Sequence, residues 1–317
     1  MSVKLWAYGT FVIGTIDVFA RSLQLLPRND LAHKGIASEL DVPYVADGSD
    51  AHMLDIYMPT TAPRPWPVAV YVHGGGFKYF DKASHWAAAA KFAEAGYLTF
   101  NVNYRLAPKH PYPAAVEDVA AALEWIAANA GRYGGDVSRL VLSGESAGGN
   151  LTLGAAIAAS WKRPERFAQR VWDTGLRPRV LLPACGYLAV ANPQRHAENH
   201  DMPAWMNGRI LQVSSAYLPD HAQPKPEHAF ANPLHMLREL GAPDRPFPAT
   251  FAIVGDADPV QDDTIALGNL LRERGIRGGH RVYPKGFHAF HAATWTQLAK
   301  TAWDDQLAFL DAHMPAG

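Results

Sequence analysis

Cysteine is almost absent from this chain, which has one, Cys185, in 317 residues. A single thiol cannot form an internal disulfide, and it has no second cysteine with which to build a zinc cluster. The fold must therefore rest on packing alone. Because a reducing compartment suits such a chain, we expect a cytoplasmic protein.

An excess of either charge is also absent. Lys and Arg number 29 against 30 Asp and Glu, and no basic run is present that would follow a phosphate backbone. Nucleic acid is therefore not an expected partner. With 48% hydrophobic residues the chain can bury a sizeable core, so we expect a globular protein that acts on small molecules.

The N-terminal region lacks an apolar run long enough to cross a bilayer, although it loosely imitates a signal peptide. Asp17 interrupts it, and its apolar residues recur at helical spacing. We expect residues 1–38 to form a helical cap segment with no stable membrane insertion. A secretory signal and a peripheral membrane anchor stay open as alternatives. The apolar set is Leu5, Val12, Ile16, Phe19, Leu23 and Leu26.

From residue 39 onward, short apolar runs alternate with helix-forming segments, which is typical of a mostly parallel sheet with helices on both faces. The sequence predicts antiparallel strands at 39–47 and 51–59, then buried parallel strands at 67–73, 97–104, 139–143, 179–185, 249–255 and 280–284. Helices are predicted at 85–96, 114–130, 147–160, 264–275 and 292–313. The rhythm breaks over residues 187–233, which we predict to be a cap insertion between two parts of one core, 39–186 and 234–317.

Ligands of open parallel sheets bind at the carboxyl ends of the strands, so reactive residues are sought there. Gly144-Glu145-Ser146-Ala147-Gly148 follows the apolar run 139–143 and precedes a helix-forming segment. This is the G-x-S-x-G pattern of a nucleophile elbow, in which a sharp turn exposes the serine hydroxyl. Ser146 is therefore a candidate nucleophile.

A serine hydroxyl needs a general base, and the base needs an orienting carboxylate. Four acids follow the run 249–255, and His288 and His291 follow the run 280–284, in the order Ser, Asp, His that this type of fold uses. Asp262 and Asp263 stand at the start of the next predicted helix. We expect them to be solvated carboxylates that interact favourably with the helix dipole. The four acids are Asp256, Asp258, Asp262 and Asp263.

Three consecutive glycines in HGGGF, residues 73–77, follow the apolar run 67–73. They could form a plain turn, hold a phosphate, or direct backbone N–H groups at a charge that develops during a reaction. A P-loop would need G-x-x-x-x-G-K-[ST], and a dinucleotide site G-x-G-x-x-G, and neither matches this stretch. The phosphate interpretation is therefore the weakest, and His73 is expected to orient the loop.

Five motifs in order, HGGGF, YRLAPKHPYPAAVED, GESAGG, DPVQDD and HAF, resemble the hormone-sensitive-lipase-like family of α/β-hydrolase esterases over residues 73–290. The resemblance implies an α/β-hydrolase fold with a helical cap. It assigns the acid to Asp258 and the base to His288, with Asp256 and His291 as alternatives. Val260 and Ala289 depart from the family pattern, which has Leu and Gly there. Glu145 stands where the family often has Asp, and it is expected to matter little if it points away from the substrate.

The resemblance also implies a serine carboxylesterase that needs no cofactor and acts on a small ester and water through an acyl-enzyme. The oxyanion donors would be the N–H groups of Gly75, Gly76 and Ala147. Arg105 and Asp118 are expected to form a buried ion pair. Short to medium acyl chains are expected, because a capped pocket is small, and a homodimer stays open. The predicted pocket residues are Phe77, Met202, Trp205, Met206 and Leu211.

Three alternatives compete with the interpretation as a serine carboxylesterase. An amidase or arylformamidase would use the same three residues, and a ligand receptor on a hydrolase scaffold would be expected to lack one of them. Metal binding is disfavoured, because His196 and His200 do not fit H-E-x-x-H and His288 with His291 lacks a clear third ligand.

Overall fold

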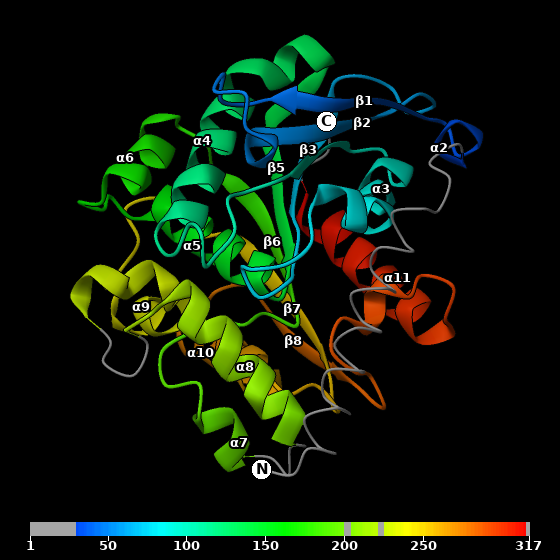
Figure 1. The fold of residues 1–317 in the computed structure, drawn as a ribbon. Helices are drawn as coiled ribbons and strands as arrows, with labels where there is room; N and C mark the ends of the chain where they lie inside the picture. Colours follow the sequence, from blue (N-terminus) through cyan, green and yellow to red (C-terminus); the bar gives the residue numbers. More distant parts are fainter. Residues whose placement is uncertain (1–29, 200–203, 221–224, 315–317) are drawn as a thin grey trace.

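A computed structural model describes residues 30–199, 204–220 and 225–314. Its centre is an eight-stranded sheet in the order β1-β2-β4-β3-β5-β6-β7-β8 (Figure 1). β1 pairs antiparallel with β2, and β2 with β4, whereas the other neighbouring strands are parallel. The strands are β1 Ile36–Pro43, β2 Met53–Pro59, β3 Trp66–Val72, β4 Leu98–Val102, β5 Gly135–Glu145, β6 Pro178–Ala184, β7 Ala249–Gly255 and β8 Gly278–Tyr283.

Helices cover both faces of the sheet (Figure 1). One layer contains α4 Ala114–Asn129, α5 Ala147–Ser160 and α10 Gln261–Glu273, with α6 Arg166–Asp173 and α9 Pro233–Glu239 packed beside them. The other layer contains α3 Trp86–Glu94 and α11 Gln297–His313. A short helix, α2 Asp30–His33, precedes β1. The predicted mixed, mostly parallel sheet between helices is confirmed.

The alternation of side chains along β3 shows why the sheet needs both layers. Val68, Val70 and Val72 belong to the core on the α4/α5 side, whereas Ala69 and Tyr71 belong to the core on the α3/α11 side. Successive residues of a strand point to opposite faces, so a continuous apolar run is stable only when both faces are covered. The run 67–73 thus forms a fully buried strand.

Several predicted boundaries were wrong. The first strand begins at Ile36 rather than residue 39 and ends at Pro43, with a bulge at which Asp41 has φ 57°. The last helix begins at Gln297 rather than residue 292, because Thr296 caps it by accepting a hydrogen bond from Ala299 N at 3.2 Å. Helix α6 was not predicted at all.

The interval predicted as a cap insertion contains α7 Arg195–Asn199, α8 Ala204–Tyr217 and the 3-10 helix η4 Pro226–Ala231. Asp263, expected to be solvated, is instead 3% exposed, and this expectation was wrong. Its carboxylate accepts hydrogen bonds from Leu188 N and Ala189 N and pairs with Arg195 at 2.7 Å. Desolvation is offset by these contacts, and Asp263 ties the interval to α10.

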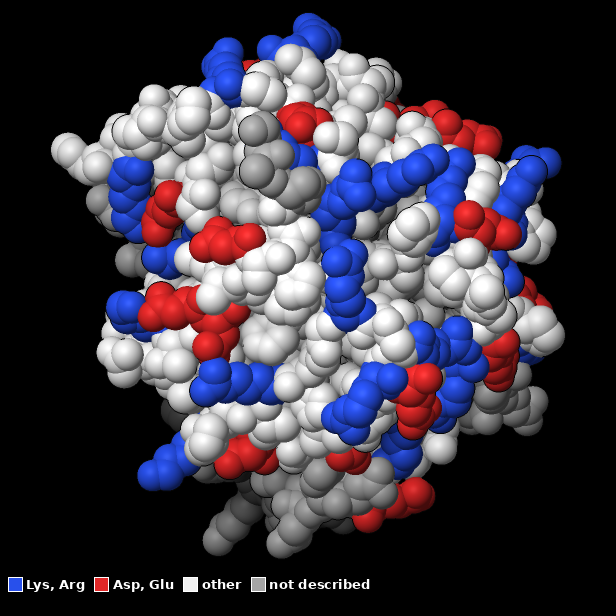
Figure 2. Space-filling model, turned by 180° about the vertical axis from the view of Figure 1, so that it is seen from behind, with Lys and Arg blue, Asp and Glu red and all other residues white. Residues whose placement is uncertain are grey.

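The predicted N-terminal helix within residues 1–38 lies largely outside the described residues, which begin at residue 30. In the part of the chain that the structure describes, no helix has both the length and the apolar character to cross a bilayer. On the face seen in Figure 2, acidic and basic side chains are interspersed, in keeping with the balanced composition.

Arg105, which follows β4, pairs with Asp118 of α4 as predicted. The Asp118 carboxylate is 4% exposed and accepts hydrogen bonds from Arg105 N at 2.7 Å and Arg105 Nε at 2.9 Å. His52 Nε2 lies 3.1 Å from the same carboxylate. Glu117 reaches the same guanidinium at 3.0 Å, but its side chain is 46% exposed.

Replacement of Asp118 by Ala is expected to lower the free energy of unfolding by about 3–5 kcal/mol, because it leaves buried donors unpaired. Glu117→Ala is the matched control and should cost no more than about 1 kcal/mol, since its ion pair is solvated. Urea denaturation of both variants measures the difference. Equal losses would contradict this account of the pair.

Candidate active site

Ser146 occupies the turn between the end of β5 and the start of α5. Its backbone has φ 52° and ψ −112°, a region that a non-glycine residue adopts only when surrounding contacts enforce it. Ser146 N donates to Ala184 O at 2.9 Å, and Tyr187 N donates to Ser146 O at 3.1 Å. The turn is thus held from the end of β6, and the side chain is presented at the carboxyl edge of the sheet.

Two glycines permit the close backbone contacts of this turn. A Cβ on Gly148 would lie 2.0 Å from Val72 O, and one on Gly144 would lie 2.4 Å from Gly148 O. Real Cβ atoms do not approach backbone oxygens so closely, so both positions require glycine. The same contact brings the serine turn against the end of β3, where HGGGF begins.

His288 and Asp258 complete a hydrogen-bonded line with the serine. His288 Nε2 lies 3.0 Å from Ser146 Oγ, and His288 Nδ1 lies 3.0 and 2.9 Å from the two carboxylate oxygens of Asp258. Val260 N donates to Asp258 Oδ1 at 2.9 Å and fixes the carboxylate. The Asp258 side chain is fully buried, whereas that of His288 is 37% exposed. The imidazole therefore reaches solvent while its orienting acid does not.

The environment of His288 favours the imidazolium. Burial lowers the pKa of this ring, but the charge and hydrogen bond of Asp258, with a smaller contribution from Glu145, outweigh it and raise the pKa above the ordinary value. Asp258 thus orients the ring through Nδ1 and stabilises the proton that the ring would accept at Nε2.

The two alternatives from the sequence lie elsewhere. Asp256 accepts a hydrogen bond from Lys285 N at 2.7 Å in an exposed position. His291 is 1% exposed and its Nε2 lies 3.4 Å from Glu145 Oε2. The line to Ser146 therefore runs through Asp258 and His288.

Ala289, where the family pattern has Gly, follows His288 with φ 60° and ψ 27°. This left-handed conformation costs an alanine roughly 1–2 kcal/mol that a glycine avoids. His288 nevertheless contacts Ser146 and Asp258 with this alanine in place.

The HGGGF loop folds back on itself beside the serine turn. Gly75 and Gly76 have φ 113° and 60°, and Lys78 N and Tyr79 N both donate to Gly75 O, at 3.1 and 3.0 Å. A Cβ on Gly76 would lie 2.6 Å from Val213 Cγ1, so α8 packs directly over this glycine. The loop has no room for side chains at these positions.

His73 directly follows β3, and its side chain is buried. Its ring stacks on Tyr104 with centroids 4.3 Å apart, and its Nδ1 lies 2.8 Å from Gly74 O. Burial, together with the nearby His85, lowers the pKa of His73 to about 3. A ring that stays neutral and fixed in this way orients the loop.

The predicted pocket residues are only partly described. The Phe77 ring is fully buried and stacks on Tyr217 with centroids 3.7 Å apart. Met206 and Leu211 are half-buried on α8. Met202 lies outside the described residues, and Trp205 is described only as part of α8. Lining of a substrate pocket by these residues stays a prediction.

One group of side chains has the spacing of metal ligands. Among the described residues, one set of three ligand atoms lies within 4.8 Å of one another, on Cys185, Asp258 and His288. Asp258 and His288 are hydrogen-bonded to each other in the line to Ser146. His288 and His291 bind different carboxylates, and His200 lies outside the described residues.

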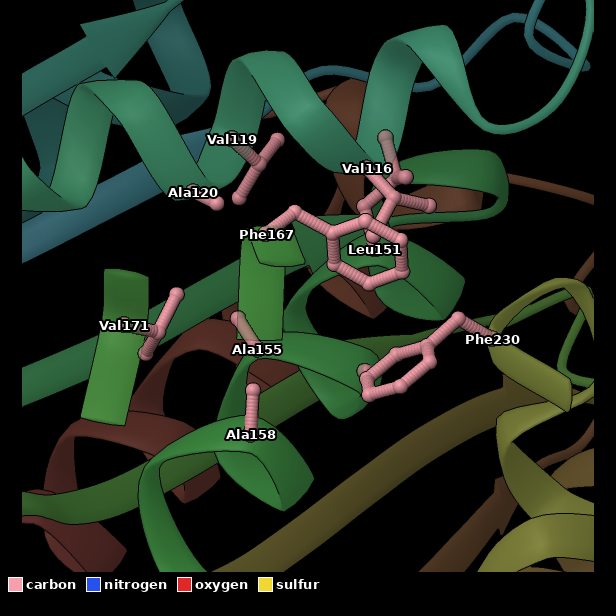
Figure 3. Close-up of a pocket in the computed structure, with 10 residues that line it drawn as sticks. Val116, Val119, Ala120, Leu151, Ala155, Ala158, Phe167, Val171 and Phe230 are labelled. Carbon is pink, nitrogen blue, oxygen red and sulfur yellow. The ribbon is translucent and has the colours of Figure 1, made fainter. Parts of the chain in front are cut away.

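A small pocket between α4, α5, α6 and η4 is lined by apolar side chains (Figure 3). Phe167 and Phe230 meet there edge to face, with centroids 4.9 Å apart. No titratable side chain lines it, so it offers packing rather than chemistry. The residues labelled in Figure 3 are Val116, Val119, Ala120, Leu151, Ala155, Ala158, Phe167, Val171 and Phe230.

One residue of the site was underestimated from the sequence. Glu145 was expected to matter little, yet its carboxylate is buried between two histidines immediately before Ser146. A charged residue inside an elbow pattern is the only signal that the sequence offers, since its partners lie 60 and 146 positions away.

Residues 69–292 match the family model described as alpha/beta hydrolase fold, which covers more than half of the chain. The chain belongs to the hormone-sensitive-lipase-like α/β-hydrolase family. Esterase LipI of Mycobacterium tuberculosis is 35% identical over 257 residues, 78% of this chain and 74% of the relative. Carboxylesterase NlhH of the same species is 31% identical over 268 residues, which are 81% of this chain and 76% of the relative.

A solved structure, bacterial heroin esterase, superposes with a TM-score of 0.77 at 23% identity, over 96% of this chain and 91% of that one. It supports the fold. With the relatives and the family match, the prediction of a carboxylic ester hydrolase is confirmed.

NMR titration of the His288 ring tests its environment without reference to catalysis. The pKa should lie above the ordinary value of about 6.5, so the ring should stay protonated to higher pH than a free histidine. Asp258→Asn should lower the pKa, because it removes the raising charge. Asp256→Asn is the matched control and should leave the pKa of His288 unchanged. If Asp256→Asn alone shifts this pKa, the acid is Asp256 rather than Asp258.

Proposed function

We propose that the protein is a serine carboxylesterase that cleaves short- to medium-chain acyl esters through an acyl-enzyme intermediate. The observation that carries this proposal is the continuous line from Asp258 through His288 to Ser146 Oγ, with contacts of 2.9–3.0 Å. Hydrogen-bond contact between nucleophile, base and orienting acid is the arrangement that serine hydrolases need.

In the first half of the reaction, Ser146 Oγ attacks the ester carbonyl while His288 Nε2 takes the hydroxyl proton. Collapse of the tetrahedral intermediate breaks the bond to the alcohol, which leaves with the proton returned by His288. In the second half, water attacks the acyl-serine, His288 takes a proton from it, and the carboxylic acid departs as the proton returns to Ser146 Oγ. Asp258 keeps the ring in the required tautomer throughout.

The oxyanion of each tetrahedral intermediate would be held by backbone N–H groups of Gly75, Gly76 and Ala147. Ala147 is the first residue of α5, and the first N–H groups of a helix have no partner within it and carry the positive end of its dipole. Gly75 and Gly76 come to the same edge because the serine turn contacts the end of β3. Donors fixed in advance stabilise a charge that develops only in the transition state.

The proposed acyl range rests on the crowding around the loop. Val213 of α8 packs over Gly76, and Phe77 is fully buried against Tyr217, so the space beside the loop is bounded by bulky side chains. Such a boundary favours small acyl groups over long ones. The cytoplasmic location expected from the sequence remains a prediction, and the homodimer remains open.

An amidase or arylformamidase would use the same three residues and is the second candidate. A receptor role is disfavoured, since Ser146, Asp258 and His288 are all present and in contact.

Ser146→Ala should abolish hydrolysis of p-nitrophenyl butyrate, lowering kcat by roughly 10⁴-fold or more, while circular dichroism shows an intact fold. A phosphonate ester should label wild type at Ser146, detectable by mass spectrometry of the peptide. Undiminished turnover by folded Ser146→Ala would remove the assignment.

His288→Ala and His291→Ala should be compared in parallel. His288→Ala should lose activity by a similar factor to the serine variant, because it removes the base. If His291→Ala alone loses activity, the base is His291.

Initial rates on p-nitrophenyl esters of increasing acyl length should peak at short to medium chains and fall with long ones. An N-formyl aromatic amide should be a poor substrate by comparison. Faster turnover of the amide would favour the second candidate.

A further inference from the structure

Glu145 ends β5 one residue before the proposed nucleophile, and its carboxylate points into the protein. The side chain is 7% exposed. A Cβ placed on Gly74 would lie 2.8 Å from Glu145 Oε1, so this carboxylate lies directly beneath the HGGGF loop. Glu145 therefore contacts the oxyanion loop while its backbone continues into the serine turn.

Two histidines from distant elements hold the carboxylate, one on each oxygen. His85 Nε2, from the 3-10 helix η2 Lys82–His85, lies 3.4 Å from Oε1. His291 Nε2, from the 3-10 helix η5 Phe290–Ala292, lies 3.4 Å from Oε2. A carboxylate oxygen only accepts, so His85 Nε2 is the donor to Oε1. Oε2 has no hydrogen-bond partner among the described residues, and His291 faces it only at ion-pair distance. Glu145 is thus clamped between the segment after HGGGF and the loop that carries His288.

The ring of His85 is fixed by a hydrogen bond, whereas His291 is held by its burial and through its backbone. His85 Nδ1 lies 2.9 Å from Ser84 Oγ, and Asp81 caps η2 through Ser84 N at 2.8 Å. His291 is 1% exposed, and its carbonyl accepts a hydrogen bond from Trp303 Nε1 of α11 at 3.0 Å. A carboxylate with such partners has little freedom to move.

The Glu145 carboxylate is ionised. Burial acts to raise its pKa, but His85 above all, with His291 and His288, outweighs burial and lowers the pKa to about 2. A buried charge paired with imidazoles rather than with Lys or Arg acts on its surroundings through a poorly screened medium.

We propose that Glu145 is a positioning residue of the esterase site, whose clamped negative charge holds the serine turn against the oxyanion loop and stabilises protonated His288. This inference rests on the proposed function of Ser146 and His288. Glu145 touches neither substrate nor the reacting atoms, and it acts through its neighbours.

The charge matters most when His288 holds the serine proton, because the ring is positive in the transition state and neutral before it. The negative charge of Glu145, which acts to raise the pKa of His288, thus lowers the barrier rather than only binding substrate. Titratable groups facing Glu145 or His288 from the surrounding elements are Tyr71, His73, His85, Tyr104, Cys185, Asp258 and His291.

Glu145→Gln removes the charge and keeps the shape. We expect kcat for p-nitrophenyl butyrate to fall about tenfold with KM changed less than about twofold, since ground-state contacts with substrate are untouched. The acid limb of kcat/KM should move to lower pH by roughly one unit, because loss of a negative charge disfavours the imidazolium. Glu145→Asp retains the charge, and it should restore most of kcat and most of the pH position of the acid limb.

Glu124→Gln is the matched control. Glu124 is a carboxylate on α4, 52% exposed and paired with Arg170, and its loss should change neither kcat nor the limb. An unmoved acid limb in folded Glu145→Gln overturns the proposal, even where kcat falls, because a purely structural role would not shift the pH profile.

If Glu145→Gln does not fold, Glu145→Thr is used, with the same shift expected; failure of both to fold makes the residue structural and overturns the proposal. Failure of the proposed function is distinguishable from failure of this inference. It would be seen if the phosphonate did not label wild type at Ser146, or if Ser146→Ala kept its activity.

Discussion

The turn at Ser146 is possible only because backbone packs against backbone on both sides of it. Gly148 meets Val72 O, and Gly144 meets Gly148 O, at distances that leave no room for a side chain. The strained serine cannot relax without separating the end of β5 from the end of β3. The strained backbone of Ser146 is maintained because both strands are buried on both faces of the sheet, and their packing outweighs the local strain.

The remaining groups of the site assemble around this turn because parallel strands end at one edge. Asp258 follows β7, His288 follows β8 and HGGGF follows β3, so residues far apart in sequence meet without a long connection crossing the sheet. Each is then fixed by a local contact. Val260 N holds the carboxylate of Asp258, and the stacked ring of His73 supports the glycine loop.

The sequence predicted the parts of the structure that depend on local pattern. The apolar runs located all eight strands, and glycines with a serine between them located the turn, because both patterns are short-range. Asp263 and Glu145 could not be placed in this way. Their burial depends on Arg195 and on two histidines that reach them only in the folded chain, and a carboxylate near a helix start is more often solvated.

The anchoring of Leu188, Ala189 and Arg195 to Asp263 has a consequence for variation of the cap. Asp263 lies in the first turn of α10, five residues after Asp258, so the interval predicted as a cap and the loop that bears Asp258 share one fixed point. A cap transplanted from a relative would need its own partner for that carboxylate. Without such a partner, the buried charge of Asp263 would be left unpaired near the loop that bears Asp258. A cap exchanged to change the substrate range would then also disturb the position of Asp258.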